Sequence, residues 1–255
     1  MGVPSPIVPL WSTAFDLTNY SFINECVSRG LHNQFDAKFN PLWDKHPAGR
    51  AVLNYWKQLQ KAKIIPPDAV TQTYHQAEAV IQGGQGVYFM MDNGQLKALN
   101  SKATSKVAGQ IKVAQIPGKT HAGTGFTSVY YQTTRSDPEA AWPLTRFYGG
   151  TDKNGKFTGP IQGAAITEGL RTGYKSTDTD PAVIKASRGW ATPDDLEMFV
   201  KQAGVTYGQG PVVNEKWYSD YNDLMAQTLS KFLAGQISVD EALSSSAQQV
   251  RKLKA

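Results

Sequence analysis

Residues 214–243, NEKWYSDYNDLMAQTLSKFLAGQISVDEAL, carry the clearest helical pattern in the chain. Asn214 is the predicted N-cap of a long helix, Gly235 stands where a helix commonly ends with a positive φ, and Ser238 and Glu241 have the spacing of a capping box for a second helix. Apolar residues recur at three- and four-residue steps, as on a helix buried along one face: Trp217, Tyr221, Leu224, Met225, Leu229, Phe232 and Leu233. The stretch therefore predicts a helix, a tight turn and a last helix.

Outward from this stretch, short apolar segments with strand character lie between predicted helices. The glycine-, threonine- and aspartate-rich residues 149–190 have no clear assignment. The predicted strands are 6–11, 86–91, 111–116 and 126–132. The predicted helices cover 18–29, 52–59, 74–81 and 95–100, and two more begin at the Ser136 capping box and at Thr192.

Composition narrows the function classes. The chain has 255 residues, 40% of them hydrophobic, and a net charge of +5 from scattered lysines and arginines without a nucleic-acid-binding motif. The single Cys26 lies on an apolar helical face, which predicts a buried thiol and excludes an internal disulfide. No apolar run reaches the roughly 18–20 residues of a membrane span. The N-terminus lacks a signal-peptide pattern, so a cytoplasmic location is expected if Met1 is the true start.

Several passages together resemble the extracellular solute-binding proteins of ABC importers, and more narrowly the family 1 sugar-binding subunits. The resemblance lies in the order and spacing of the following motifs: Tyr74-x-x-Ala-Glu-x-x-Ile-x-Gly83 before strand 86–91, the Pro117-Gly118 end of strand 111–116, Gly123-Thr124-Gly125, Asp137-Pro-Glu-Ala-Ala-Trp142, Gly235-Gln-x-Ser-x-x-Glu-Ala-Leu243 and Ala247-Gln-Gln-Val-x-x-Leu253.

This resemblance implies a fold of the periplasmic-binding-protein type II class, in which two α/β lobes close on a ligand. The chain would hold mostly the helix-rich C-terminal lobe plus a returning segment of the N-terminal lobe. Residues 1–85 would be the first part of the C-terminal lobe, 86–135 the returning N-terminal-lobe and hinge strands, and 136–255 the last part of the C-terminal lobe.

The family pattern is longer than this chain, and its first half has no counterpart here. Three interpretations stay open: a fragment, a natural truncated paralogue, or one half of a split protein. Residues 86–135 would then supply strands without most of their sheet, which exposes edges and apolar surface. We expect a missing N-terminal half, another partner or self-association to cover them.

Sugar binding needs flat apolar faces and planar polar groups in a concave site. Trp11 fits ligand stacking or core packing equally, and Trp217 also fits packing at the start of its helix. Asp92 and Asn93 follow a buried strand but also suit a turn, and the glycines around Thr124 suit either a backbone approach to ligand or a plain loop. The candidate ligand-binding residues are Trp11, Asp92, Asn93, Gly123, Thr124, Gly125, Tyr174, Tyr207, Asn214 and Trp217.

The resemblance implies non-enzymatic binding of a carbohydrate or polyol for uptake through a membrane permease, in the periplasm or outside the cell for the full-length family. We expect no cofactor, no nucleic-acid partner and no catalytic residue. We also expect no metal, since the four histidines lack ligand spacing to one another. One alternative is an interaction or structural protein without ligand uptake. A second is an enzyme that acts on a phosphorylated substrate through Lys119 and the 123–125 loop. The sequence does not identify the sugar.

Overall fold

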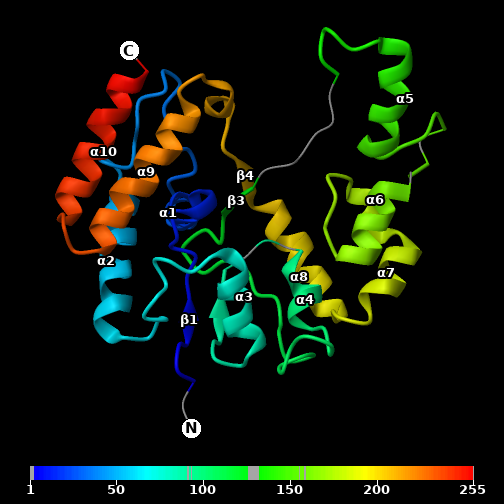
Figure 1. Cartoon of the computed structure of the whole chain (residues 1–255), viewed down its shortest axis with the longest axis horizontal. Helices are drawn as coiled ribbons and strands as arrows, with labels where there is room; N and C mark the ends of the chain where they lie inside the picture. Colours follow the sequence, from blue (N-terminus) through cyan, green and yellow to red (C-terminus); the bar gives the residue numbers. More distant parts are fainter. Residues whose placement is uncertain are drawn as a thin grey trace. The chain divides into compact units, whose positions relative to one another are not determined.

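The computed structural model describes residues 3–90, 92, 94–125, 132–154, 156–157 and 159–254. The chain divides into two compact units (Figure 1). Unit 1 comprises Met1–Met90, Gln115–Gly125 and Lys201–Ala255, and unit 2 comprises Met91–Ala114 and Phe126–Val200. The lobe assignment of residues 1–85, 86–135 and 136–255 remains a prediction.

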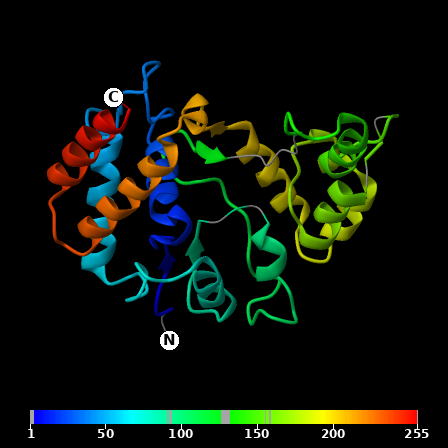
Figure 2. The ribbon, with the colours of Figure 1, turned by 45° about the horizontal axis from the view of Figure 1, so that its top comes forward.

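Helices that pack on one aromatic core dominate unit 1. In Figures 1 and 2, α10 (Val239–Leu253) lies beside both α9 (Tyr218–Leu233) and α2 (Pro47–Ala62). The other elements are η1 (Ala14–Asp16), α1 (Leu17–Ser28), α3 (Tyr74–Gln82) and η4 (Pro211–Asn214). The largest side chains that they bury completely include Trp11, Trp43, Trp56, Tyr221 and Phe22.

The helix pair at the C-terminus confirms the capping signals. Gly235 has φ of +73°, and the Ser238 hydroxyl accepts a hydrogen bond from the Glu241 amide at 3.1 Å. The prediction that Asn214 caps the first helix is wrong. Asn214 ends the short η4 turn, and α9 starts at Tyr218 with Trp217 as its N-cap. The Glu215 amide is already used by the Val212 carbonyl, so the long helix begins one turn later.

The strands are shorter than the apolar runs that predict them. β1 (Ile7–Val8) pairs in parallel with β2 (Tyr88–Phe89), and β3 (Gly123–Gly125) pairs in parallel with β4 (Thr206–Gly208). The predicted strand at 111–116 is wrong. Its Val113 and Ile116 amides donate to the side chains of Asp195 and Gln202 at 2.9 Å each, and this segment pairs with no described strand. Most of the predicted strand 126–132 lies outside the described residues.

Unit 2 consists mainly of short helices. The helices predicted at 95–100 and after Thr192 are present. The helix predicted to begin with a Ser136 capping box is capped by Asp137 instead. The Asp137 carboxylate accepts a hydrogen bond from the Glu139 amide at 3.0 Å. The bounds are α4 (Gln95–Leu99), α5 (Pro138–Gly149), α6 (Gly159–Gly163), η2 (Ala164–Glu168), η3 (Lys175–Thr179), α7 (Pro181–Ser187) and α8 (Pro193–Gly204, which runs into unit 1).

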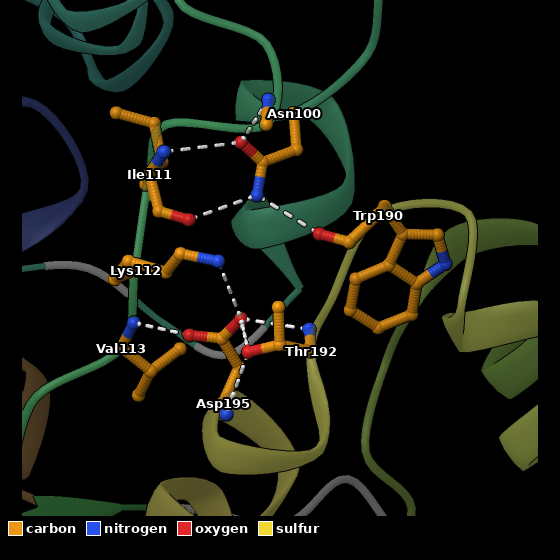
Figure 3. Close-up of polar contacts among 8 residues, drawn as sticks. Asn100, Ile111, Lys112, Val113, Trp190, Thr192 and Asp195 are labelled. Carbon is orange, nitrogen blue, oxygen red and sulfur yellow. Dashed lines mark hydrogen bonds and ion pairs between the residues drawn. The ribbon is translucent and has the colours of Figure 1, made fainter.

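Two buried polar side chains hold the 109–113 segment in place (Figure 3). The Asn100 amide oxygen accepts from the Gly109 and Ile111 amides, and its nitrogen donates to the Ile111 and Trp190 carbonyls. The Asp195 carboxylate accepts from the Val113 amide and, at 2.8 and 2.7 Å, from the amide and hydroxyl of Thr192. These bonds replace the strand pairing that an extended segment would otherwise need.

Asp195→Asn is expected to lower the free energy of unfolding by about 2 kcal/mol at pH 7, because it removes charge-assisted hydrogen bonds. Burial opposes ionisation, but the bonds from Thr192 and Val113 and the nearby Lys112 ammonium hold the pKa of Asp195 below its ordinary value. The carboxylate therefore stabilises the fold above the unfolded pKa of about 3.9, and this contribution is lost as the pH falls through the folded pKa.

Urea unfolding at a series of pH values measures this effect. The difference between wild type and variant should begin to narrow as the pH falls below about 4, the unfolded pKa, and should narrow further as the Asp195 carboxylate is protonated in the folded protein. Asp194→Asn, at the neighbouring exposed position, is the matched control and should change stability by less than about 0.5 kcal/mol. A difference for Asp195→Asn that stays constant down to pH 2 would contradict the assigned role.

Candidate functional site

A small hollow in unit 1 combines aromatic rings with planar amides beside the β3–β4 pair. Its lining comes from the chain after α1, from both strands and from the segment leading into α9. His32, Gln34, Phe35, Thr124 and Gln209 are among the residues that line the hollow. The enclosed volume is about 10 Å³, room for roughly one water.

The β3 strand is fixed tightly beside α1. A Cβ atom on Gly123 would lie 2.6 Å from Ile116 Cδ1, so a larger residue there requires the Ile116 side chain to move. The Gly123 amide donates to the Val205 carbonyl at 3.2 Å, and the Thr124 amide donates to Asn24 Oδ1 at 2.8 Å. Residues 123–125 are thus a paired strand, and these two amides are used within the protein. The Thr124 hydroxyl donates to the Tyr207 carbonyl at 3.2 Å.

The aromatic part of the site is the pair formed by Tyr207 and His32. Their rings meet edge to face with centroids 4.6 Å apart, and Tyr207 is 44% exposed. Edge-to-face packing holds the tyrosine ring in one orientation while part of its surface stays open to solvent. Tyr207 can therefore offer a flat apolar face to a ligand.

The polar part of the site includes a buried acceptor with no partner in the described part of the chain. Gln34 is 8% exposed; its amide nitrogen donates to the Leu31 carbonyl, but its Oε1 receives no hydrogen bond there. An unmet buried acceptor costs roughly 1–3 kcal/mol. A water or ligand hydroxyl that reached this oxygen through a shift of the surrounding side chains would therefore be stabilised. Gln209 also lines the hollow; its Oε1 accepts from the Tyr218 hydroxyl, and burial raises the pKa of Tyr218 to about 12.

Two predicted tryptophans lie in the unit 1 core. Trp11 is 1% exposed and packs against Trp56, with centroids 5.0 Å apart. Trp217 is half-buried against Phe35 and Phe39, with centroids 5.7 and 6.2 Å away. Trp217 thus supports, through Phe35, the wall of the hollow. Contact of either tryptophan with a ligand remains a prediction.

The remaining candidates divide between the units. Asn214 is exposed in unit 1. In unit 2, Asp92 Oδ1 accepts from the Gly94 amide at 2.9 Å, which is the turn bonding expected before α4. The Tyr174 hydroxyl donates to the Gly149 carbonyl at 2.7 Å, and its ring packs on Phe157. Asn93 lies outside the described residues.

His32, Gln34 and Gln209 are contributors that sequence patterns did not indicate. They lie outside helices and strands, where no periodicity marks a buried side chain. Thr124 and Tyr207 were predicted, and the structure brings their backbones together as strand partners. The only available signal for the others was the polar and glycine-rich composition of their loops, which many surface loops share.

The residues that the structure describes contain no group of three or more histidine, cysteine, aspartate and glutamate side chains placed to hold a metal ion. None of their helices combines the length and apolarity required to cross a bilayer.

Comparison with known proteins identifies the fold. No protein-family model and no curated protein matches the chain. Among solved structures, maltose-bound MalE3 of T. maritima superposes with a TM-score of 0.77 at 20% identity over 98% of this chain and 60% of that one. A solute-binding protein from Thermotoga lettingae bound to α-D-tagatose gives 0.74 at 12% identity, with coverages of 98% and 60%. One from Agrobacterium radiobacter with ribitol gives 0.72 at 18%, with 98% and 59%.

These neighbours confirm the predicted fold class. The chain has the fold of the sugar- and polyol-binding proteins of ABC importers, of the periplasmic-binding-protein type. It spans about 60% of the length of these solved structures. Sequence identity of 12–20% establishes the fold alone and not the ligand or the partner.

Proposed function

We propose that this chain is part of a solute-binding protein that binds a carbohydrate or polyol without chemical change and serves an ABC importer. The observation that carries the proposal is the hollow beside β3–β4. Gln34, whose buried amide oxygen has no partner in the described part of the chain, lines it together with His32, and the His32 ring meets the partly exposed Tyr207 ring edge to face. The fold supports the same proposal, because its solved neighbours are bound to maltose, tagatose and ribitol.

The proposed binding chemistry follows from the two kinds of group. The Tyr207 ring would pack against the C–H face of a sugar, and Gln34 Oε1 would accept a hydrogen bond from one hydroxyl. Binding is non-covalent, and the ligand favours whichever conformation it binds more tightly. Presentation of that conformation to a membrane permease, outside the cytoplasm, completes the proposed role.

Calorimetric titration with maltose, ribitol, D-mannitol and D-tagatose tests the proposal. For a sugar that binds, Tyr207→Ala should weaken the affinity about tenfold, because loss of the aromatic face removes roughly 1–1.5 kcal/mol. Tyr207→Phe keeps the ring and should bind nearly as well as wild type. Tyr148→Ala, at a tyrosine of similar exposure on α5, is the matched control and should leave the affinity unchanged.

Two results would overturn the proposal. The first is the absence of binding to this panel and to a wider set of sugars and polyols by a folded chain, which would favour an interaction or structural role. The second is binding that Tyr207→Ala and Tyr148→Ala affect equally. An enzyme acting on phosphate esters through Lys119 gains no support from the geometry, because the Gly123 and Thr124 amides already donate to protein oxygens.

A further inference from the structure

A carboxyl group is enclosed between α1 and α2 in unit 1. The Glu25 side chain of α1 is 15% exposed, and its Oε1 accepts a hydrogen bond from the indole nitrogen of Trp56 on α2 at 2.7 Å. Glu25 also lines a cavity of unit 1 together with the apolar residues Val8, Leu10 and Leu59. A carboxylate in such surroundings loses most of its hydration, which disfavours the charged form.

The second oxygen of Glu25 has a cation beside it but no hydrogen bond. Arg29 Nη1 lies 3.2 Å from Glu25 Oε2, yet this buried oxygen has no hydrogen-bond partner in the described part of the chain. The same Nη1 donates to the Glu25 backbone carbonyl at 2.9 Å, and the guanidinium lies over the Tyr55 ring, 5.3 Å from its centroid. Two contacts therefore hold Arg29 in place without requiring a charge on Glu25.

The neutral form of Glu25 keeps most of these contacts. The Trp56 bond needs only an acceptor oxygen, which a protonated carboxyl group still has. Protonation removes the ion pair, but Arg29 keeps its carbonyl and ring contacts and, at 25% exposure, part of its hydration. Burial accordingly raises the pKa of Glu25 to about 6, although the Trp56 hydrogen bond and the Arg29 charge oppose this shift.

Glu25 is the member of this cluster whose charge changes in mildly acidic solution. Besides Arg29, its electrostatic neighbours in the described ranges are the Cys26 thiol on α1, the Tyr55 hydroxyl on α2 and the Tyr88 hydroxyl on β2. Burial raises the pKa of all three, that of Tyr88 to about 12, so they stay neutral near pH 6.

The helix that carries Glu25 also holds strand β3 beside the hollow. Asn24, the adjacent residue on α1, accepts the Thr124 amide through its Oδ1 at 2.8 Å, and this contact involves no charge. At the opposite end of α1, Asp16 of η1 interacts with Asp223 of α9. The α1 helix thus connects the Glu25 cluster to the backbone of β3.

We propose that the Glu25–Arg29 pair is a proton switch, in which uptake of one proton by Glu25 strengthens the packing of α1 on α2 and thereby the hold of α1 on β3. A carboxyl group whose folded pKa of about 6 exceeds its unfolded value of about 4.3 contributes stability that is fully present below the unfolded value. This contribution is lost as the pH rises through about 6. The inference rests on the packing of unit 1 and not on carbohydrate binding.

Carbon-13 NMR titration of the Glu25 carboxyl group and urea unfolding of wild type and Glu25→Gln test the proposal. The carboxyl group should titrate near pH 6. Because glutamine takes up no proton, the unfolding equilibrium constant of the variant relative to wild type should fall roughly tenfold between pH 5 and pH 7.5. Glu241→Gln, at an exposed position on α10 of the same unit, is the matched control, and its ratio should change less than about threefold.

Amide hydrogen exchange distinguishes a switch from a buried acid that only titrates. In wild type, the protection factor of the Thr124 amide should be roughly tenfold higher at pH 5 than at pH 7.5, and in Glu25→Gln this difference should shrink below about threefold. The wild-type titration and exchange keep the test decisive if Glu25→Gln does not fold. Titration at or below pH 4.5, a pH-independent stability ratio, or equal Thr124 protection at both pH values would overturn the proposal. Absence of sugar binding alone would not affect it.

Discussion

Replacing Trp43 with alanine is expected to lower the free energy of unfolding of unit 1 by about 4 kcal/mol, the largest effect of any single change considered. The side chain is fully buried, and its ring packs against Phe35 and Tyr221 with centroids 5.4 and 5.9 Å away. Its indole N–H also donates to Ser246 Oγ at 3.1 Å, which joins the segment before α2 to α10. Truncation would remove this packing and leave a cavity between the helices that form the core.

Urea unfolding followed by far-ultraviolet circular dichroism measures the loss. Trp43→Phe keeps an aromatic ring but removes the hydrogen bond, and should cost about 2 kcal/mol. Trp142→Ala is the matched control, because Trp142 is 55% exposed on α5 and should change stability by less than about 0.5 kcal/mol. Equal losses of stability in the alanine variants at positions 43 and 142 would contradict a stabilising role of Trp43 in the aromatic core of unit 1.

Gly49→Ala is expected to lower the free energy of unfolding by about 3 kcal/mol, although alanine is the better helix former by roughly 1 kcal/mol. Gly49 lies in the first turn of α2, where a Cβ atom would sit 2.4 Å from the Trp43 carbonyl oxygen and 3.2 Å from Leu243 Cδ2. The nearer atom belongs to the backbone, so relief requires a shift of the segment that holds Trp43. This steric cost exceeds the gain in helix propensity.

The same substitution at Gly204 is the control. Gly204 ends α8, and a Cβ atom there would meet nothing within 4 Å. Gly204→Ala should therefore be neutral or stabilising by up to about 1 kcal/mol. Thermal unfolding of both variants checks the pair, and a Gly49→Ala protein as stable as wild type would show that α2 does not approach the Trp43 backbone so closely.

The helices could be predicted because their signals are local. The three- and four-residue spacing before Gly235 and the Ser238 cap depend on residues within one or two turns, and α9 and α10 form where these signals place them. The exact start of α9 was not predictable in this way. Asn214 is a good capping residue, but the η4 turn competes for the same backbone and moves the start of the helix to Tyr218.

The strands and the candidate site could be predicted only in part. Residues 111–116 alternate as a strand does, but a strand forms only beside a partner, and here side chains of Asp195 and Gln202 take the backbone bonds instead. Thr124 and Tyr207 could be named from their residue types. Their pairing across β3 and β4, the ring contact of Tyr207 with His32, and the place of Thr124 beside Gln34 depend on contacts between residues far apart in the chain.

The sequence by itself therefore determined the long helices of unit 1, the Ser238 cap, the buried Cys26 and the resemblance that predicted the fold class, because each depends on short-range spacing or on the order of motifs. The tertiary structure alone decided where extended segments pair and which polar atoms of the described residues are buried without a partner. Those properties arise when distant segments exclude water from the same space, and no local pattern records which segments will meet.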